Sequence, residues 1–426
     1  MTQRKRELHM KKHIIVTCIL ILVLTGVLAG FFIIRSRMDE TGTPGKTDTS
    51  QAGITQEQSE QTYRSKTAEG QSGKNQTGEN QIEENRTESS QTEENLNGAA
   101  ETDSQADAPD QEQITMMFTG DVLFANSFSA CYESGGIDAV VAPELRQQMK
   151  DADILMVNEE FPFSTRGTQM EDKQYTFRAD PSYVSALNEL GVDIVSLANN
   201  HILDYGKEAL SDTFTTLDQA GIRYAGAGES ASRAKELQVF EVGGHKIGIL
   251  AASRVIPVEG WNVDNQTPGV FTTYDPAALC AEIEKAKETC DYVVVFVHWG
   301  VEYEEYPQDY QRSLAKNYID SGADLVIGGH THCLEGIEYY KGSMICYSLG
   351  NFIFGSQIDR SAAVEVTLTA SGEETDRLIP VYATGGCTKL MDDADAKNLY
   401  QYMQNISEGV TISAEGNIID AETAME

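Results

Sequence analysis

The sequence predicts an α/β domain that is preceded by a transmembrane helix and a disordered linker. Three observations support this prediction. An uncharged run fills residues 14–34, polar and acidic residues dominate 38–112, and from Ile114 onward short apolar runs alternate with stretches of helical period. Alternation of strands and helices along the chain is typical of layered α/β domains.

The run at 14–34 has the length of a membrane-spanning helix. Its 21 residues carry no charge, and at about 1.5 Å per residue they span roughly 30 Å, the thickness of a bilayer's hydrocarbon core. Five basic residues precede the run and two follow it, so the positive-inside rule assigns residues 1–13 to the cytoplasm. We expect a single-pass protein of the cell membrane whose C-terminal domain is extracellular. The alternative is a signal peptide cleaved after 27–29.

The segment 38–112 is predicted to be a disordered spacer. Gln, Glu, Thr, Ser, Asn and Gly dominate it, and Tyr63 is its single aromatic residue. Such a composition buries too little apolar area to offset the entropy of an ordered chain. A specific binding tail is the alternative interpretation of the same segment.

The charge of the chain argues against nucleic acid as a partner. The chain has 32 Lys and Arg against 66 Asp and Glu, a net charge of −34, and residues 113–426 alone carry 20 against 48. Binding to a phosphate backbone needs a basic surface, which this composition does not provide.

The order of elements in the domain follows from the period of its apolar residues. Strands are predicted in 114–121, 152–160, 192–201, 222–228, 291–300 and 323–332. Helices are predicted in 181–190, 206–220, 276–290 and 307–322. Two antiparallel hairpins are expected to turn at Gly243-Gly244 and at Lys341-Gly342. We expect the domain to span 113–392 and to be followed by a peripheral C-terminal segment, 393–426.

Polar residues gather at the carboxyl ends of these predicted strands, where open α/β sheets place their ligand crevices. They are Asp121, Asn158, Glu159, Glu160, Asn199, Asn200, His201, His298, His330 and His332. Four of the five histidines after residue 13 occupy such positions, which indicates a shared site.

Residues of these types are typical of a metal centre. Neutral imidazole together with carboxylate and amide oxygen suits Mn, Zn or Fe, as one or two ions. His330 and His332 are two residues apart, so they share a face and can address neighbouring ions, while Asp121 and Glu160 supply negative charge. Two-metal sites stabilise the attacking and leaving oxygens of a phosphoryl or similar hydrolytic displacement.

Further residues near the strand ends are candidates for supporting roles. Asp204 follows His201 and either orients that imidazole or caps the next helix. Asn351 either binds a ligand or closes a turn. The residues expected to contact substrate are Asn158, Asn199, Glu302, Tyr303 and Asn351. The six cysteines after residue 113 show no close-spaced framework, so we expect free thiols or at most one disulfide.

The strand-end residues lie in sequence blocks that resemble one protein family. Within 113–356 the blocks read FTGDVLF, NEEFPFS, SLANNHILDYG, FVHWGVEY, GADLVIGGHTH and YSLGNFIF, and they resemble the successive blocks of the CapA family of poly-gamma-glutamate capsule proteins. That family is similar to the calcineurin-like metallophosphoesterases, which implies a four-layer α/β/β/α sandwich. The resemblance also implies a protein anchored outside a bacterial cell that serves synthesis, export or retention of an anionic polymer. The implied partners are that capsule polymer or its membrane synthase.

Position within these blocks implies a role for each strand-end residue. The implied metal ligands are Asp121, Glu160, Asn200, His298, His330 and His332, with Glu160 in the place of a bridging aspartate. The implied catalytic acid is His201, with Asp204 beside it. The chain departs from the phosphoesterase pattern in two places. Asp121 is followed by Val122-Leu123 in place of x-His, so one metal shell lacks an imidazole, and Asn158-Glu159-Glu160 replaces Gly-Asp.

Two classes of function remain open on the sequence alone. In the first, the protein is a metal-dependent hydrolase of a phosphoester or amide-like bond, either in capsule synthesis or as a metallophosphoesterase unrelated to capsule. In the second, it is a non-catalytic component that binds or guides the polymer on the same fold. The negative domain would repel a polyanion unless metal or local basic residues offset its charge. The basic candidates are Arg178, Lys207, Arg254 and Arg312.

Overall fold

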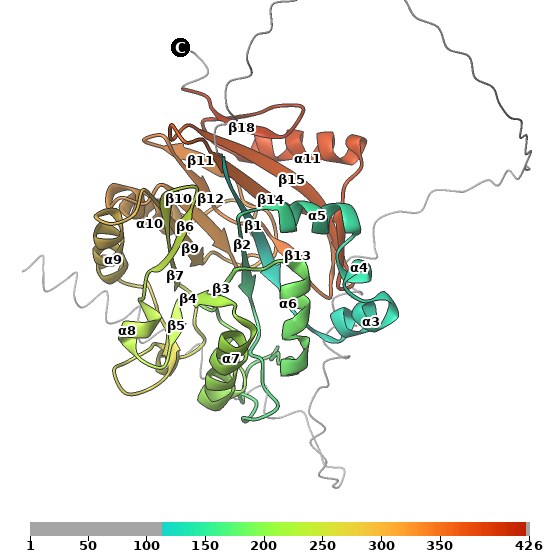
Figure 1. The fold of residues 1–426 in the computed structure, drawn as a ribbon, viewed down its shortest axis with the longest axis vertical. Coiled ribbons are helices and arrows are strands. Elements are labelled where there is room, and N and C mark those ends of the chain that lie inside the picture. Colours follow the sequence, from blue (N-terminus) through green and yellow to red (C-terminus); the bar gives the residue numbers. More distant parts are fainter. Residues whose placement is uncertain (1–112, 423–426) are drawn as a thin grey trace, which may run out of the picture. The chain divides into compact units, whose positions relative to one another are not determined.

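The computed structural model describes residues 113–422. The predicted cytoplasmic segment 1–13, the anchor 14–34 and the linker 38–112 lie outside the described residues, and Figure 1 draws them as a thin grey trace. Within 113–422, no helix combines the length and the apolar composition that crossing a bilayer requires.

The larger sheet has ten strands and combines a parallel half with an antiparallel half. Its order is β17-β18-β15-β14-β1-β2-β3-β4, with β13 paired to β1 and β16 paired to β15. β1 to β4 run parallel, whereas β14, β15, β18 and β17 pair antiparallel. The bounds are β1 (Ile114–Val122), β2 (Ile154–Glu159), β3 (Ile194–Ser196), β4 (Arg223–Ala225), β13 (Asn351–Ile353), β14 (Gln357–Leu368), β15 (Glu374–Thr384), β16 (Cys387–Leu390), β17 (Val410–Ile412) and β18 (Asn417–Asp420).

The smaller sheet has six strands in the order β11-β12-β10-β9-β7-β6. Its four central strands run parallel, and β6 and β11 close its two edges antiparallel. The bounds are β6 (Gln238–Val242), β7 (His245–Ser253), β9 (Tyr292–His298), β10 (Leu325–Gly329), β11 (Ile337–Tyr340) and β12 (Ser343–Cys346). A separate ribbon pairs β5 (Ala227–Gly228) with β8 (Gly269–Val270).

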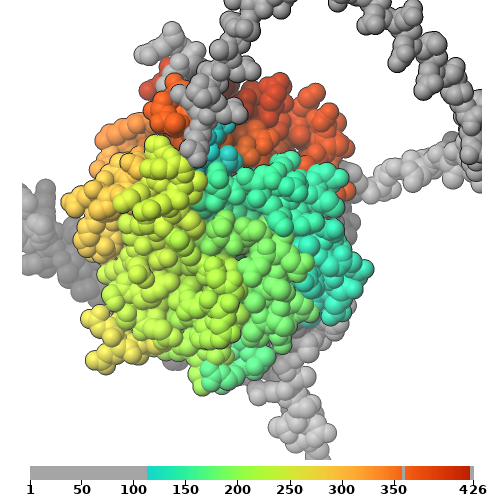
Figure 2. Space-filling view, viewed as in Figure 1, coloured from blue at the N-terminus to red at the C-terminus, as the bar shows by residue number. Residues whose placement is uncertain are grey.

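Helices connect the strands and cover the outer faces of the sheets. They are α3 (Asn126–Gly135), α4 (Ile137–Val140), α5 (Pro143–Asp151), α6 (Val184–Leu190), α7 (Gly206–Ala220), α8 (Ala231–Ala234), α9 (Ala277–Lys287), α10 (Asp309–Asp320) and α11 (Asp393–Ile406), with short 3₁₀ turns η1 (Pro181–Tyr183) and η2 (Glu259–Trp261). In Figure 1, α9 and α10 lie on one side of the molecule and α5 and α6 on the other, with both sheets between them. In the space-filling view, the cyan to yellow-green chain from α3 to α8 forms most of the face that is turned to the reader (Figure 2).

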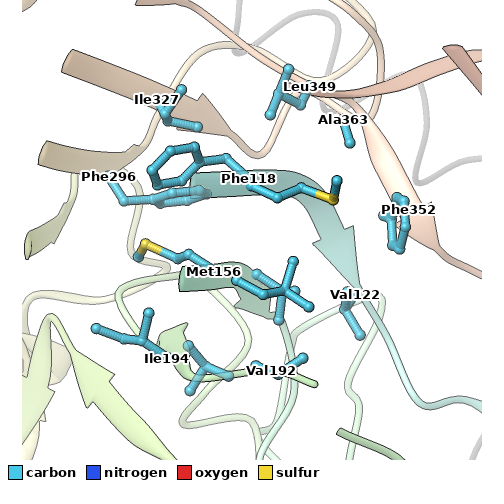
Figure 3. Close-up of a cluster of buried hydrophobic side chains, with 14 of the residues drawn as sticks. Phe118, Val122, Met156, Val192, Ile194, Phe296, Ile327, Leu349, Phe352 and Ala363 are labelled. Carbon is cyan, nitrogen blue, oxygen red and sulfur yellow. The ribbon is translucent and has the colours of Figure 1, made fainter. Parts of the chain in front are cut away.

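Alternating side chains of the six-stranded sheet face two different layers. On β9, Val294 and Phe296 join the apolar cluster that contains Phe118 of β1, so this face packs against the ten-stranded sheet. Figure 3 shows Phe118 and Phe296 side by side in that cluster. The intervening residue Val295 joins a second cluster with Leu279 of α9 and other residues of α9 and α10. The alternation therefore stacks helices, one sheet and the other sheet in successive layers.

The mixed α/β class and the predicted hairpins are confirmed. Gly243 and Gly244 have φ of 55° and 81°, and Lys341 and Gly342 have 54° and 82°. Two successive residues with positive φ form the tight turns whose twist matches that of antiparallel strands. The predicted helix 206–220 is observed with the same bounds.

Two parts of the predicted organisation are corrected. The predicted strands through 201 and 332 end earlier, at Ser196 and Gly329, so that the polar residues lie on loops just beyond the strands. The boundary at residue 392 is not a boundary of the fold. β18 pairs with β15, and Leu399 and Met403 of α11 are buried in the main apolar cluster, so the segment after 392 is part of the domain.

One disulfide joins distant parts of the domain. Cys131 of α3 is bonded to Cys387 of β16, at a sequence separation of 256. The other four cysteines of the described residues, Cys280, Cys290, Cys333 and Cys346, are free thiols. This agrees with the expectation of at most one bridge.

Candidate metal centre

The ends of strands from both sheets supply the side chains of the candidate site. β1 and β2 run parallel with Asp121 paired to Asn158, and β9 and β10 run parallel with His298 paired to Gly329. Because the carboxyl ends of parallel strands meet at one edge of a sheet, each pairing brings polar residues to the same edge.

The two sheets touch at Gly329 and Asp121. The backbone N–H of His330 donates to Asp121 Oδ2 at 3.1 Å. A Cβ atom at residue 329 would lie only 2.7 Å from Asp121 Oδ1, closer than side chains tolerate. Glycine at 329 therefore allows the end of β10 to reach the carboxylate at the end of β1.

Two groups of potential ligands share one carboxylate. Glu160, His298 and His330 form the first group, and Asp121, Glu160 and His332 form the second, with the ligand atoms in each group within 4.8 Å of one another. All five side chains are buried. Glu160 belongs to both groups and is therefore placed to bridge two ions.

The chemistry of these groups fits a divalent metal. Glu160 is fully buried, yet neither of its carboxylate oxygens has a hydrogen-bond partner, and the same holds for Nδ1 of His330. A buried carboxylate without donors costs several kcal/mol. A cation between the carboxylates and imidazoles would remove that cost, so the donor set matches the predicted centre of Mn, Zn or Fe.

Burial sets the protonation of the imidazoles. It lowers the pKa of His298 and His330 well below the usual range, and neighbouring histidines add to the effect, so both are neutral and able to coordinate. Burial also opposes a charge on His332, but the carboxylates of Asp121 and Glu160 outweigh it and raise the pKa of His332 to about 9. The two carboxylates thus favour a positively charged group between them.

The backbone turns sharply so that both histidines face the site. His330 has φ of 97° and His332 has φ of 58°, in the left-handed region that side chains other than glycine rarely adopt. Residues with such strained backbone conformations are frequent at active sites and ligand-binding sites. Their imidazoles fall in different ligand groups, as predicted from their spacing, with ring centres 6.1 Å apart.

Three asparagines connect the ligands. Asn200 Oδ1 lies 2.8 Å from His298 Nε2, so it can share an ion with that imidazole. Asn158 donates to Asp121 Oδ1 at 2.8 Å and accepts from Asn199, which also accepts from the backbone N–H of His201. The polar atoms of Asn158 and Asn199 are thus engaged within the protein. This corrects the predicted substrate contacts of these two residues to a positioning role.

The structure decides between the two interpretations of Asp204. Its Oδ2 accepts from Nδ1 of His201 at 2.7 Å and from the backbone N–H of Phe177 at the same distance. α7 begins after Tyr205, and no side chain caps it. Asp204 therefore orients the imidazole and is not a helix cap.

Lys173 is a site residue that the sequence did not predict. Its Nζ lies 2.9 Å from His201 Nδ1 and donates to the carboxylate of Asp204 and the backbone oxygen of Asn200. Trp261 lies under the same ammonium, 5.2 Å from Nζ to the ring centre. Burial lowers the pKa of Lys173, whereas Asp204 acts to raise it. No local signal marks this loop lysine, because its role depends on a contact with residues about thirty positions away.

Two of the residues predicted to contact substrate, Glu302 and Tyr303, lie on the loop after β9. Glu302 and Tyr303 are exposed, and the Tyr303 ring lies 6.1 Å from that of His332. Asn351 is buried within β13, so it does not close a turn. Its Oδ1 lies 2.8 Å from His332 Nδ1, which orients the imidazole of that candidate metal ligand. Trp299, which follows His298, is fully buried and packs in the second apolar cluster.

Comparisons with known proteins place this arrangement in a family. The model of the bacterial capsule synthesis protein PGA_cap matches residues 115–356, more than half of the chain and the whole of the candidate centre. The capsule biosynthesis protein CapA of Bacillus anthracis is 32% identical over 299 residues, which are 68% of this chain and 72% of that protein. The PGA biosynthesis protein CapA of Bacillus subtilis (strain 168) is 33% identical over 292 residues, 67% of this chain and 75% of that protein.

A solved structure, the NAD nucleotidase NadN of Haemophilus influenzae, aligns over 70% of this chain and 63% of its own, with a TM-score of 0.39 and 11% identity. The sequence matches, by contrast, are close enough to assign the family, and they confirm the resemblance seen in the sequence blocks. The chain belongs to the family of the bacterial capsule synthesis protein PGA_cap.

Proposed function

We propose that the protein is a membrane-anchored, extracellular capsule-biosynthesis protein of the CapA type, and that its buried centre is a metal-dependent hydrolase site. The names of the Bacillus relatives support the link to capsule and poly-gamma-glutamate. One observation carries the hydrolase part. Glu160 is shared by two groups of metal ligands, and beside them His201 is held by a buried carboxylate.

The packing of the domain supports a sandwich of the metallophosphoesterase type. Two sheets share one apolar core, and α9 and α10 cover the outer face of the smaller sheet. In such a sandwich the strand ends of both sheets can meet at one site, as Asp121 and the backbone of His330 do here.

Residues of both sheets would hold the metal. Glu160, His298, His330 and the amide oxygen of Asn200 would form one shell, and Asp121, Glu160 and His332 the other. A bound divalent metal supplies Lewis-acid stabilisation of the negative charge that develops on oxygen during hydrolysis. Asn351 and Asn158 hold His332 and Asp121 in place.

His201 is positioned to move a proton. Because the carboxylate of Asp204 accepts a hydrogen bond from Nδ1–H, the orientation of the ring is fixed and Nε2 is the atom left for proton exchange with substrate. Burial lowers the pKa of His201, with Asp204 opposing and Lys173 adding to the effect, so the protonated ring gives up its proton readily. His201 would protonate the leaving oxygen or nitrogen of a phosphoester or amide-like bond.

A non-catalytic polymer-binding role is the alternative, and metal content with turnover separates the two. The full-length chain, purified without chelator, should contain a transition metal and hydrolyse a generic aryl phosphate, and chelation should abolish the activity. A chain that binds no metal and turns over no substrate would leave only the polymer-binding role.

The extracellular location is part of the same proposal. The uncharged run 14–34 with its basic flank supports an anchor, and the disulfide Cys131–Cys387 suits an oxidising compartment. Protease added to intact spheroplasts should cut the linker and release a stable fragment that begins near residue 113. Complete protection of the chain would contradict this location.

A further inference from the structure

The proposed function requires the domain to bind an anionic substrate although its own net charge is strongly negative. Residues 113–426 carry 20 Lys and Arg against 48 Asp and Glu. Most arginines of the described residues are already neutralised by ion pairs. Arg312, for example, pairs with Glu338 and Glu408 at 2.9 and 3.0 Å, which removes it from the candidates. A recognition residue should therefore be an arginine with no carboxylate partner.

Arg254 meets this requirement. Among the arginines in the described part of the chain, it is the one whose guanidinium forms neither an ion pair nor a hydrogen bond to protein, whereas Arg178 and Arg223 each donate to a backbone carbonyl. The guanidinium is half-buried and stacks on two rings, 4.0 Å from the centre of Tyr274 and 5.1 Å from that of Tyr310. Its N–H groups remain available to a ligand.

The two rings are themselves anchored. The hydroxyl of Tyr310 accepts from the backbone N–H of Gly300 at 2.8 Å, and that of Tyr274 accepts from Ile256 at 3.2 Å. A guanidinium held between fixed aromatic faces loses little freedom when it binds, which favours affinity.

Arg254 also lies next to the candidate metal centre. Ser253 pairs with His298 across β7 and β9, and the backbone N–H of Arg254 donates to the carbonyl of His298 at 2.8 Å. The loop that anchors Tyr310, at Gly300, follows His298 directly. The backbone of Arg254 thus lies at the same strand ends that carry the candidate metal ligands, and its guanidinium lies over the rings of Tyr274 and Tyr310 beside them.

We propose that Arg254, held by Tyr274 and Tyr310, recognises an anionic group of the substrate, a carboxylate or a phosphate, beside the metal centre. This inference rests on the proposed function, because it assigns a substrate subsite to the same centre. Arginine binds both anions through paired N–H groups, so the chemistry is shared and the source must be separated by experiment.

Titration calorimetry on the full-length chain tests this role with three probes. They are a γ-linked glutamate hexamer, the same hexamer with its carboxylates amidated, and inorganic phosphate. Arg254→Gln should weaken binding of the charged hexamer or of phosphate at least 10-fold and leave the neutral hexamer unaffected. Loss for the hexamer alone identifies the polymer carboxylate as the ligand, and loss for phosphate alone identifies a phosphoester.

Two further variants separate recognition from structure. Arg254→Lys keeps the positive charge but lacks the planar guanidinium with its paired N–H groups. It should therefore bind more tightly than Arg254→Gln but more weakly than wild type. Arg223→Gln is the matched control, because Arg223 also stacks on a ring, Phe240, but lies at the amino end of β4. It should change affinity less than twofold.

Three outcomes would overturn the inference: a wild type that binds none of the probes, an Arg254→Gln loss below twofold for both anions, or an equal loss for the neutral hexamer. Metal content and aryl phosphate turnover, measured on the same samples, report on the hydrolase proposal independently. Wild-type protein without metal would contradict the hydrolase proposal. The titrations would still decide the role of Arg254.

Discussion

Gly329 and Asp121 come from different sheets and pack so closely that a Cβ on Gly329 would lie 2.7 Å from Asp121 Oδ1. The carboxylate is fully buried and accepts from Asn158 and from the backbone of His330. This contact joins the two halves of the candidate centre, so its geometry should control metal binding.

Gly329→Ala should therefore reduce metal affinity at least 10-fold with little loss of folded protein, because the added methyl displaces a ligand carboxylate. Competition with a coloured chelator measures the affinity, and circular dichroism confirms the fold. Gly260→Ala is the control, since a Cβ at residue 260 would meet no atom within 4 Å. Unchanged affinity in Gly329→Ala would show that Asp121 is not a ligand.

His201→Asn should retain metal and fold but lose about 10²- to 10⁴-fold in turnover, the usual contribution of general acid–base catalysis. Steady-state kinetics on the aryl phosphate, with metal content determined on the same sample, check this expectation. His245→Asn, in the β6–β7 hairpin, is the matched control and should match wild type. Full turnover in His201→Asn would remove His201 from the mechanism.

Glu335 should make the stability of the domain depend on pH. Burial raises its pKa to about 8, although the hydrogen bond from Gln311 and the charge of Arg312 act to lower it. The folded state therefore holds the proton more tightly than the unfolded state. The resulting stabilisation is complete below about pH 4.5 and is lost as pH rises through about 8.

Glu335→Gln keeps a hydrogen-bonding group without the charge, so its stability relative to wild type should rise by a few kcal/mol between pH 5 and pH 9. Urea unfolding across that range measures the difference. Glu133→Gln, at an exposed position, should follow the wild-type curve. Parallel curves for Glu335→Gln and wild type would contradict the assignment.

The disulfide between Cys131 and Cys387 should stabilise the domain, because it restricts the unfolded chain over 256 residues. Replacing both cysteines by serine should lower the free energy of unfolding by about 2–5 kcal/mol. Cys280→Ser removes a free thiol and serves as the control. If reductant leaves the wild-type unfolding midpoint unchanged, the bond contributes nothing to stability.

The period of apolar residues and the turn residues predict the individual strands, helices and hairpin turns. The strand cores, the helix at 206–220 and the turns at Gly243-Gly244 and Lys341-Gly342 follow from period and turn chemistry. The helices of 126–151 were not predicted, because they are short and mostly polar: α3 buries Phe128, and α5 buries Leu145 and Met149. The elements after residue 392 each bury few apolar side chains. Their place in the larger sheet follows from the pairing of β18 with β15, which the sequence pattern does not show.

The sequence predicts which residues make up the candidate site, but not how they are grouped. Strand-end position identified Asp121, Glu160 and the histidines, because carboxyl ends of parallel strands share an edge. The division into two groups around Glu160 depends on how closely the two sheets approach, which no local pattern encodes. Lys173 and the unpaired state of Arg254 likewise depend on tertiary contacts.

Elemental analysis of the full-length chain decides whether Glu160 holds a metal, by comparing the metal content of wild type, Glu160→Gln and Glu159→Gln. Both glutamates are fully buried with carboxylate oxygens that lack hydrogen-bond partners, but only Glu160 belongs to the ligand groups. We expect one or two equivalents of Mn, Zn or Fe in wild type and in Glu159→Gln, and loss of the metal in Glu160→Gln. Equal metal content in all three proteins, or wild type that binds no metal, would contradict it.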